Sequence, residues 1–398
     1  MSLPDPLYAD GVDFTVVVIV IVKTIAVFAL LMVSVLIYIW WMRRVLGMMQ
    51  NRYGPNRAGP FGILQTLADG VKLFFKEHAN PNTVDRPVYL AAPYLALIPA
   101  FLAFSIVPVG GTVEVAGKTT YLQLVETPVG ILFLLAMSGI GLYGIMLAGW
   151  SSGSKYPLLG SVRASAQLLS YEAAFSLAIV GALVQSGTLS TRGIVNDQSW
   201  DGITALWSEW YLLPALVAFV IFVIAAVAET NHPPFDLAEA EQELTGGFNT
   251  EYSGIRFAIF YLSEFMNLIT MCAIAVTLFL GGPSGPSLGF LPDDGTVNVW
   301  IMPVVWFLVK LWALLFGTIW LRASLPRLRY DQLMGLGWKY LIEIAFLWII
   351  VSGVVVVANE QDWNLWVVVP PVAIGAVVVY AALFASMPRR GELLEEIK

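Results

Sequence analysis

Charged residues are scarce in this sequence. Asp, Glu, Lys and Arg make up 12% of its 398 residues, whereas hydrophobic residues make up 58%. A soluble globular domain carries roughly a quarter of charged residues, and the mean hydropathy of this chain is +0.76. Lipid rather than water therefore surrounds most of the chain, and we predict an all-α, polytopic bundle of transmembrane helices.

Cysteine and histidine are almost absent. The sequence contains one cysteine, Cys272, and two histidines, His78 and His232, which lie far apart in the chain. One thiol cannot hold an iron–sulfur cluster or a cysteine-rich zinc site, and a bis-histidine haem would need both distant histidines. We therefore expect no metal, no redox centre and no disulfide on this chain.

Three further features are missing, and each excludes a class of protein. The basic residues form no cluster of the kind that binds nucleic acid, and the net charge is −7. No basic region precedes the first apolar run, which is too long for a signal peptide and is predicted to be a retained first span. We find no internal repeat, which argues against a transporter built from inverted repeats.

Long apolar runs are abundant in the sequence, and a helix that crosses a bilayer needs about 20 such residues. The nine runs cover residues 14–41, 89–109, 128–149, 165–186, 211–228, 255–281, 300–321, 340–358 and 364–386.

Basic residues fix the predicted orientation of these spans. They collect in the odd-numbered loops and the C-terminal tail, whereas the even-numbered loops hold only Lys118 and Arg192. The positive-inside rule then places the N-terminus outside the cell and the C-terminus in the cytoplasm. A ninth span brings Arg389 and Arg390 to the same side, and an eight-span count would need residues 364–386 to lie off the membrane.

The first cytoplasmic loop contains an amphipathic segment, residues 61–76. Apolar side chains recur there at three- and four-residue steps, with Asp69 and Lys72 on the opposite face. This periodicity predicts a helix that lies in the interface plane or packs on the bundle. It either packs on its neighbours alone or walls an opening from the lipid into the protein.

Carboxylates occur where lipid is expected, and such groups are costly enough to indicate function. Glu172 lies about 7 residues into the fourth run, roughly 10 Å deep at the helical rise. Glu264 lies at a similar depth in the sixth run, and Glu229 ends the fifth. We predict a buried acidic cluster whose members exchange protons near neutral pH. In the alternative, each acid has a local ionic partner, for instance Arg163 for Glu172.

The densest acidic segment follows Glu229 directly. A solvated cytoplasmic loop is the ordinary explanation for such a segment. Its continuity with the intramembrane acids favours instead an acid-lined proton path. The acids of this segment are Asp236, Glu239, Glu241, Glu243 and Glu251.

Two intramembrane lysines and one glycine pattern complete the candidates. Lys310 is deep enough in the seventh run that we expect a buried carboxylate or water as its partner, whereas Lys23 can snorkel to the interface. Residues 139–144 (GIGLYG) fit the dinucleotide-binding fingerprint, but they lie inside an apolar span with no strand before them. Close helix packing explains these glycines better.

Four loop segments carry a family resemblance: residues 50–77, which begin QNRYGPNRAGP, and residues 149–172, 228–252 and 322–334, the last being RASLPRLRYDQLM. In this order they resemble the H subunit of bacterial NADH:quinone oxidoreductase, respiratory complex I. The resemblance extends over about residues 14–358. Residues 359–398 are then a C-terminal extension with a ninth helix.

The resemblance implies a membrane subunit of a proton-pumping translocase that forms part of the quinone chamber and docks the peripheral arm. Quinone is the implied substrate, other complex I subunits and lipid are the partners, and FMN and iron–sulfur clusters belong to those subunits. The implied quinone-chamber residues are Arg43, Arg52, Asp69 and Lys72. The implied proton-coupling residues are Arg163, Glu172, Glu229, Asp236, Glu239, Glu241, Glu243, Glu251 and Glu264. The implied arm-docking residues are Arg322, Arg327, Arg329 and Asp331.

The sequence departs from the family's pattern in four places. Met42 stands where a glutamate is expected, and His232 stands in place of an arginine, which makes a fixed positive charge titratable. Glu343 is an unexpected acid, and the extension beyond residue 358 is the fourth departure. Two other functions remain as alternatives: the membrane subunit of an energy-converting hydrogenase, and a stand-alone ion transporter.

Overall fold

Helices build almost all of the computed structural model, which describes residues 5–9, 11–79, 81–199, 210–237, 246–286 and 297–386. The longer helices are α1 (Phe14–Met49), α3 (Arg86–Phe104), α4 (Gly130–Ser151), α5 (Lys155–Ser186), α8 (Leu216–Glu229), α10 (Ile255–Phe279), α11 (Met302–Ser324), α13 (Ile342–Glu360) and α14 (Leu365–Ser386). The short helices are η1 (Pro6–Tyr8), η2 (Pro60–Gly62), α2 (Gln65–Phe75), α6 (Thr191–Asp197), η3 (Gly247–Asn249), η4 (Val297–Ile301), α12 (Tyr330–Leu336) and η5 (Gly337–Leu341). The strands are β1 (Thr112–Val115) and β2 (Lys118–Tyr121).

Each of the nine predicted apolar runs contains a helix. Counted over the described residues, seven helical segments are long and apolar enough to cross a membrane, which confirms a polytopic all-α bundle. The seven do not include α8 or α14, so the nine-span count stays a prediction. Helix α8 has only 14 residues and starts later than expected, because residues 211–215, around Pro214, form turns.

Two helices extend beyond the apolar runs that predicted them. Helix α1 continues to Met49 and stops where Asn51 adopts a φ of 53°. Helix α5 begins at Lys155, ten residues ahead of the predicted start at 165, with Pro157 in its first turn. A proline there removes an N–H that would have no helical partner in any case. The ends of these two helices are therefore set by residues that interrupt the helical backbone, and not by where the apolar run begins or ends.

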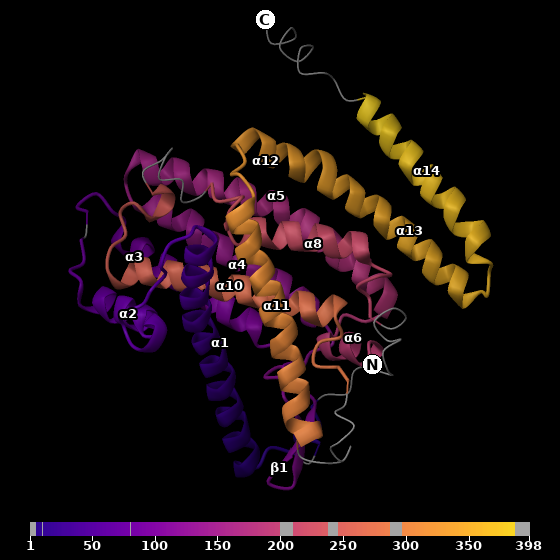
Figure 1. Cartoon of the computed structure of the whole chain (residues 1–398), viewed down its shortest axis with the longest axis horizontal. Coiled ribbons are helices and arrows are strands. Elements are labelled where there is room, and N and C mark those ends of the chain that lie inside the picture. The colour runs from indigo at the N-terminus through magenta and orange to yellow at the C-terminus, as the bar shows by residue number, and fades with distance from the viewer. Residues whose placement is uncertain are drawn as a thin grey trace, which may run out of the picture.

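A β-hairpin that we did not predict lies near the N-terminal ends of α1 and α11 (Figure 1). Strands β1 and β2 pair antiparallel from Thr112 opposite Tyr121 to Val115 opposite Lys118. The two turn residues, Ala116 and Gly117, have φ values of 52° and 76°. Positive φ at both positions is the geometry that lets a two-residue turn follow the twist of the strands.

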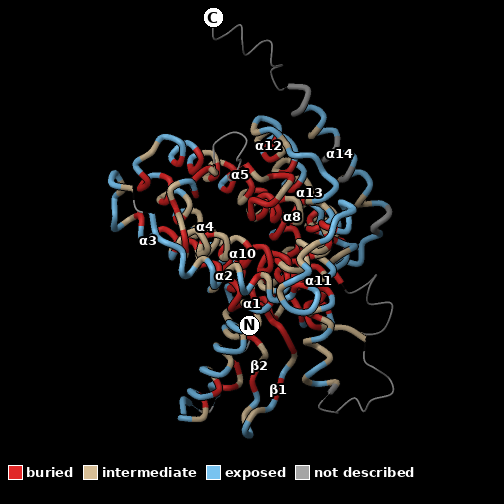
Figure 2. Tube along the Cα trace, turned by 60° about the vertical axis from the view of Figure 1, so that its left-hand side comes forward, coloured by how far each residue is buried: buried red, intermediate tan, exposed pale blue. Residues whose placement is uncertain are grey.

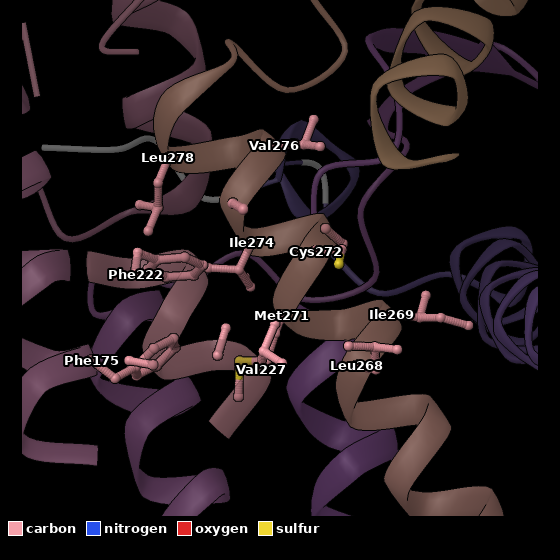
Figure 3. Close-up of a cluster of buried hydrophobic side chains, with 14 of the residues drawn as sticks. Phe175, Phe222, Val227, Leu268, Ile269, Met271, Cys272, Ile274, Val276 and Leu278 are labelled. Atoms are coloured by element: carbon pink, nitrogen blue, oxygen red, sulfur yellow. The ribbon is translucent and has the colours of Figure 1, made fainter. Parts of the chain in front are cut away.

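The hydrophobic core is centred on α10, which lies in the middle of the bundle (Figure 1). From Leu268 to Phe279 every residue of this helix is buried, and buried residues concentrate around α5, α8 and α10 (Figure 2). Phe175 of α5 and Phe222 of α8 pack together against this helix (Figure 3). A helix that is apolar all round belongs inside a bundle. Helix α14 contacts α13 and lies at the edge of the molecule.

The glycine pattern at 139–144 serves helix packing, as predicted, at its last position. A Cβ atom added to Gly144 of α4 would lie 2.6 Å from the backbone nitrogen of Ala96 in α3. Backbone atoms cannot move aside as a flexible side chain can. The two helices therefore approach each other closely only because residue 144 has no side chain.

We predict that Gly144→Ala lowers the stability of the protein. The added methyl group overlaps the backbone of Ala96, and overpacking of this kind costs about 1–3 kcal/mol. The measurement is the thermal unfolding midpoint in mild detergent. Gly141→Ala is the matched control, because a Cβ atom at Gly141 has no neighbour within 4 Å. Equal midpoints for the two variants would contradict the packing role of Gly144.

Candidate functional site: an acidic cavity inside the bundle

The three predicted intramembrane acids line one cavity. Glu172 of α5, Glu229 of α8 and Glu264 of α10 border an internal space of about 60 Å³, which α3 and α4 also line. Ser138, Asn231, Ser263 and Asn267 add further polar groups to its wall. One water needs about 10–15 Å³ of such space together with polar partners, so this cavity admits water. The geometry therefore brings the acids together as predicted.

Glu229 is held at the end of α8. The Ser138 hydroxyl donates a hydrogen bond to Glu229 Oε1. Glu229 Oε2 is buried and, within the described part of the chain, accepts no hydrogen bond. A buried carboxylate oxygen without a donor is costly while the group is ionised. This carboxylate is therefore suited to change its protonation state rather than to remain charged.

Glycines of α4 make room for Glu172. A Cβ atom at Gly139 would lie 3.5 Å from Glu172 Oε1, and Gly141 lines the cavity. The pattern GIGLYG thus has a second role that was not predicted: Gly141 forms part of the cavity wall, and Gly139 lies against the Glu172 carboxylate. Arg163 lies with its guanidinium 5.3 Å from the centre of the Tyr330 ring. Among the described residues no ion pair joins Arg163 to Glu172, so Arg163 is not the local partner that the alternative named.

Gln167 organises the loop after α8, and sequence reasoning missed it. From α5, Gln167 Nε2 donates to the carbonyl oxygen of Ala228 at 2.8 Å and to that of Phe235 at 2.9 Å. These bonds hold both ends of the turn that follows Glu229. A glutamine in an apolar helix, one turn and a half from Glu172, was the available signal.

A second group of predicted residues meets at α2. Arg43 of α1 forms an ion pair of 2.6 Å with Asp69, and Lys72 lies 3.6 Å from the same carboxylate. Burial alone would raise the pKa of Asp69, but hydrogen bonds from Arg43 and Gln65 and the nearby positive charges hold it below its usual value. Arg52 does not join this group, because its guanidinium donates to Gln50 at 2.7 Å.

The apolar face of α2 is not packed on the bundle. Leu67, Val71 and Phe74 are between 50% and 68% exposed, and Phe75 is 88% exposed. Helix α2 contacts α1 and α10 through its other side, so the role of this helix as a wall of an opening stays a prediction. Its apolar face is open to lipid or to a partner.

Comparison with known proteins identifies the family of this chain. A family model described as NADH dehydrogenase matches residues 22–353. A relative from Frankia alni, described as the H subunit of NADH-quinone oxidoreductase, is 47% identical over 380 residues, which is 95% of this chain and 82% of that protein. A second relative of the same description, from Frankia casuarinae, is 46% identical over 379 residues, with the same coverage. The chain belongs to this H-subunit family. It is thus a multi-pass membrane subunit of a quinone-reducing oxidoreductase complex.

The four predicted docking residues of this H-subunit family member lie between α11 and α12 or at the adjoining helix ends, and they differ in exposure. Arg327, Arg329 and Asp331 are exposed. Arg322 instead points inward and donates to the Met42 sulfur at 3.6 Å. The loop also meets the acidic segment, because the Leu328 amide donates to the Pro234 carbonyl oxygen at 3.2 Å.

The acidic segment is described only in part. Asp236 is half-buried, and Glu251 accepts a hydrogen bond of 2.7 Å at its backbone oxygen from the Tyr89 hydroxyl. Glu239, Glu241 and Glu243 lie outside the described residues. In the ranges that the structure describes, no group of three or more His, Cys, Asp or Glu is arranged to hold a metal ion.

We expected a buried carboxylate or water as the partner of Lys310, but the structure shows backbone carbonyl oxygens instead. Its ammonium donates to the backbone carbonyl oxygens of Leu280, Gly282 and Ser284 at 2.5–3.0 Å, and lies 4.1 Å from the centre of the Trp210 ring. These carbonyls follow the C-terminus of α10, where a cation is favoured by the helix dipole. Lys23 also has a specific partner, since it forms an ion pair of 3.0 Å with Asp5.

Proposed function

We propose that the acidic cavity is the proton-exchanging site of this subunit and couples quinone reduction to proton translocation. The observation that carries the proposal is that acids from three different helices converge on one internal space. Carboxylates at membrane depth that line a water-sized cavity are how proton relays are built. Asp236 and Glu251, and with them Glu239, Glu241 and Glu243, extend the path toward the cytoplasmic side.

The group around α2 supports a neighbouring role as the quinone entrance. A quinone is an apolar molecule with a polar head, and it partitions into the bilayer. The exposed apolar face of α2 offers it a lipid-facing wall, while Arg43, Asp69 and Lys72 offer a polar rim. We assign the lower part of the quinone chamber to this region, with Arg52 at its outer margin.

The last loop fits a docking role toward the peripheral arm. Arg327, Arg329 and Asp331 present opposite charges from one short exposed segment, and guanidinium groups suit bidentate recognition of carboxylates. FMN and iron–sulfur clusters are proposed to reside on the subunits docked there. Residues 359–398 are proposed as an extension to the membrane domain at 1–358. The family model ends at residue 353, whereas the two Frankia relatives also match part of this extension.

We predict that Glu229→Gln leaves the complex assembled and its NADH:ferricyanide activity intact, because that activity needs only the peripheral arm. Glutamine keeps the shape of glutamate but cannot titrate, so quinone reduction and proton pumping should fall together. The matched control is Glu114→Gln, the same change at an exposed position in β1.

A structural role for Glu229 predicts another pattern. If Glu229 served mainly to neutralise a buried cation, its loss would cost about 3–5 kcal/mol, and every activity would fall in proportion to the amount of complex. Near-normal quinone reduction and pumping per assembled complex would remove Glu229 from the proposed site.

We predict that the C-terminus lies in the cytoplasm, because a ninth span places Arg389 and Arg390 on the same side as the other basic loops. A reporter fused after Lys398 should be active only if it is of a type that works in the cytoplasm. A second reporter that requires export serves as the control. Activity of the exported reporter would mean that α14 does not cross the bilayer.

A further inference from the structure

His232 lies beside the acidic cavity and is the one histidine of the loop that follows α8. Its side chain is only 3% exposed. Its Nδ1 atom lies 3.5 Å from Glu264 Oε1, and its ring packs edge-on against Phe265 at 5.2 Å between centroids. Since Glu264 lines the cavity, His232 lies next to one of its three carboxylates.

The hydrogen bonds of His232 fix its tautomer. Nδ1 lies 2.7 Å from the Thr230 carbonyl oxygen, which can only accept, so Nδ1 carries the proton in the neutral ring. Nε2 then presents a lone pair. Within the described residues this buried nitrogen has no hydrogen-bond partner. A buried acceptor without a donor is destabilising, and a proton bound at Nε2 removes that unpaired acceptor.

The positive charge of Arg322 contributes to the electrostatics of His232, after burial and the bond to Thr230. Burial and the positive charge of Arg322 lower the pKa of His232 to about 4, although the bond to Thr230 opposes them. Among the described residues the polar partner of Arg322 is the thioether of Met42, a weak and uncharged acceptor. In the described part of the chain, no carboxylate is bonded to Arg322. Its positive charge therefore acts on His232 without being neutralised by an acid. Both departures from the family pattern are thus linked through Arg322, which contacts Met42 and acts on His232 by its charge.

We propose that His232 is a proton-transfer residue that exchanges protons with Glu264, and that Met42 tunes it by leaving the charge of Arg322 unneutralised. A proton carried by water binds to Nε2 and gives an imidazolium. The Nδ1–H bond then breaks, and its proton binds to the Glu264 carboxylate. This leaves a neutral acid and a neutral ring that carries its proton on Nε2, the less stable tautomer because the Nδ1 lone pair now faces the Thr230 carbonyl oxygen. Uptake at Nδ1 and release at Nε2 reverse the step. The inference rests on the proposed function of the cavity.

Other titratable groups surround the same loop and share its electrostatics. They are Glu264 and Tyr261 on α10, Arg322 on α11, Tyr38 and Arg43 on α1, Glu229 at the end of α8 and Asp236 in the loop itself.

The test is the pH profile of quinone reduction by the assembled complex in proteoliposomes, normalised to NADH:ferricyanide activity. We expect His232→Gln to lower the rate on the order of a hundredfold, the low end for loss of a general acid–base group. Met42→Glu places a carboxylate beside Arg322. Protonation of His232 then becomes easier, and the alkaline limb of the profile should move up by roughly one pH unit. Met42→Gln, the uncharged control, should leave the position of that limb where it is.

The decisive variant combines the changes. In Met42→Glu with His232→Gln the shift should vanish, because no titrating ring remains. Should His232→Gln fail to assemble, His232→Arg serves the same purpose, since arginine does not titrate in this range. Persistence of the shift in either double variant overturns the proposal, and so does a normal rate in the His232 single variant. If the Glu229→Gln complex also reduces quinone at the normal rate, the proposed role of the cavity is wrong. If only the His232 variants have a normal rate, the proposal for His232 is wrong and the proposed role of the cavity stands.

Discussion

Burial of α10 on all sides is the constraint on which the rest of the structure depends. The segment from Leu268 to Phe279 has no exposed residue, so neighbouring helices must cover its whole circumference. Such a helix is stabilised by roughly 25 cal/mol for each Å² of apolar surface removed from solvent contact in water, but in lipid the same packing must come from close fit and small residues. The helices that cover α10 therefore have little freedom to move, and its few polar groups must have defined surroundings.

Glu264 illustrates the consequence of this constraint. It lies in the N-terminal half of α10, beside Ser263 and Asn267, where the packing opens into the cavity. The glycines of α4 leave that space free on one side, and the turn held by Gln167 closes it on another. The acids of α5, α8 and α10 thus share one cavity because the packing of these helices around α10 leaves that space between them.

Sequence reasoning located the acids correctly because depth follows from the helical rise alone. Glu172 and Glu264 lie at similar distances from the start of their apolar runs. Because the fourth and sixth runs cross the bundle in the same direction, the two acids are expected at a similar depth. The partner of Lys310 was missed because it is a set of backbone carbonyls beyond the end of α10, and no side-chain pattern marks them. The hairpin at Thr112–Tyr121 was missed because four-residue strands between apolar runs resemble any polar loop. Gln167 was overlooked because a single amide carries no periodic signal.

Protonation of the cavity acids during turnover is the central claim, and infrared difference spectroscopy observes it directly. The complex is reduced with NADH in the presence of quinone, and the carbonyl stretch of protonated carboxylic acids is recorded in H₂O and D₂O. A redox-dependent band that shifts in D₂O and is lost or altered in Glu229→Gln is the result that the account predicts. A spectrum in that region that is identical in the native and Glu229→Gln complexes would contradict it.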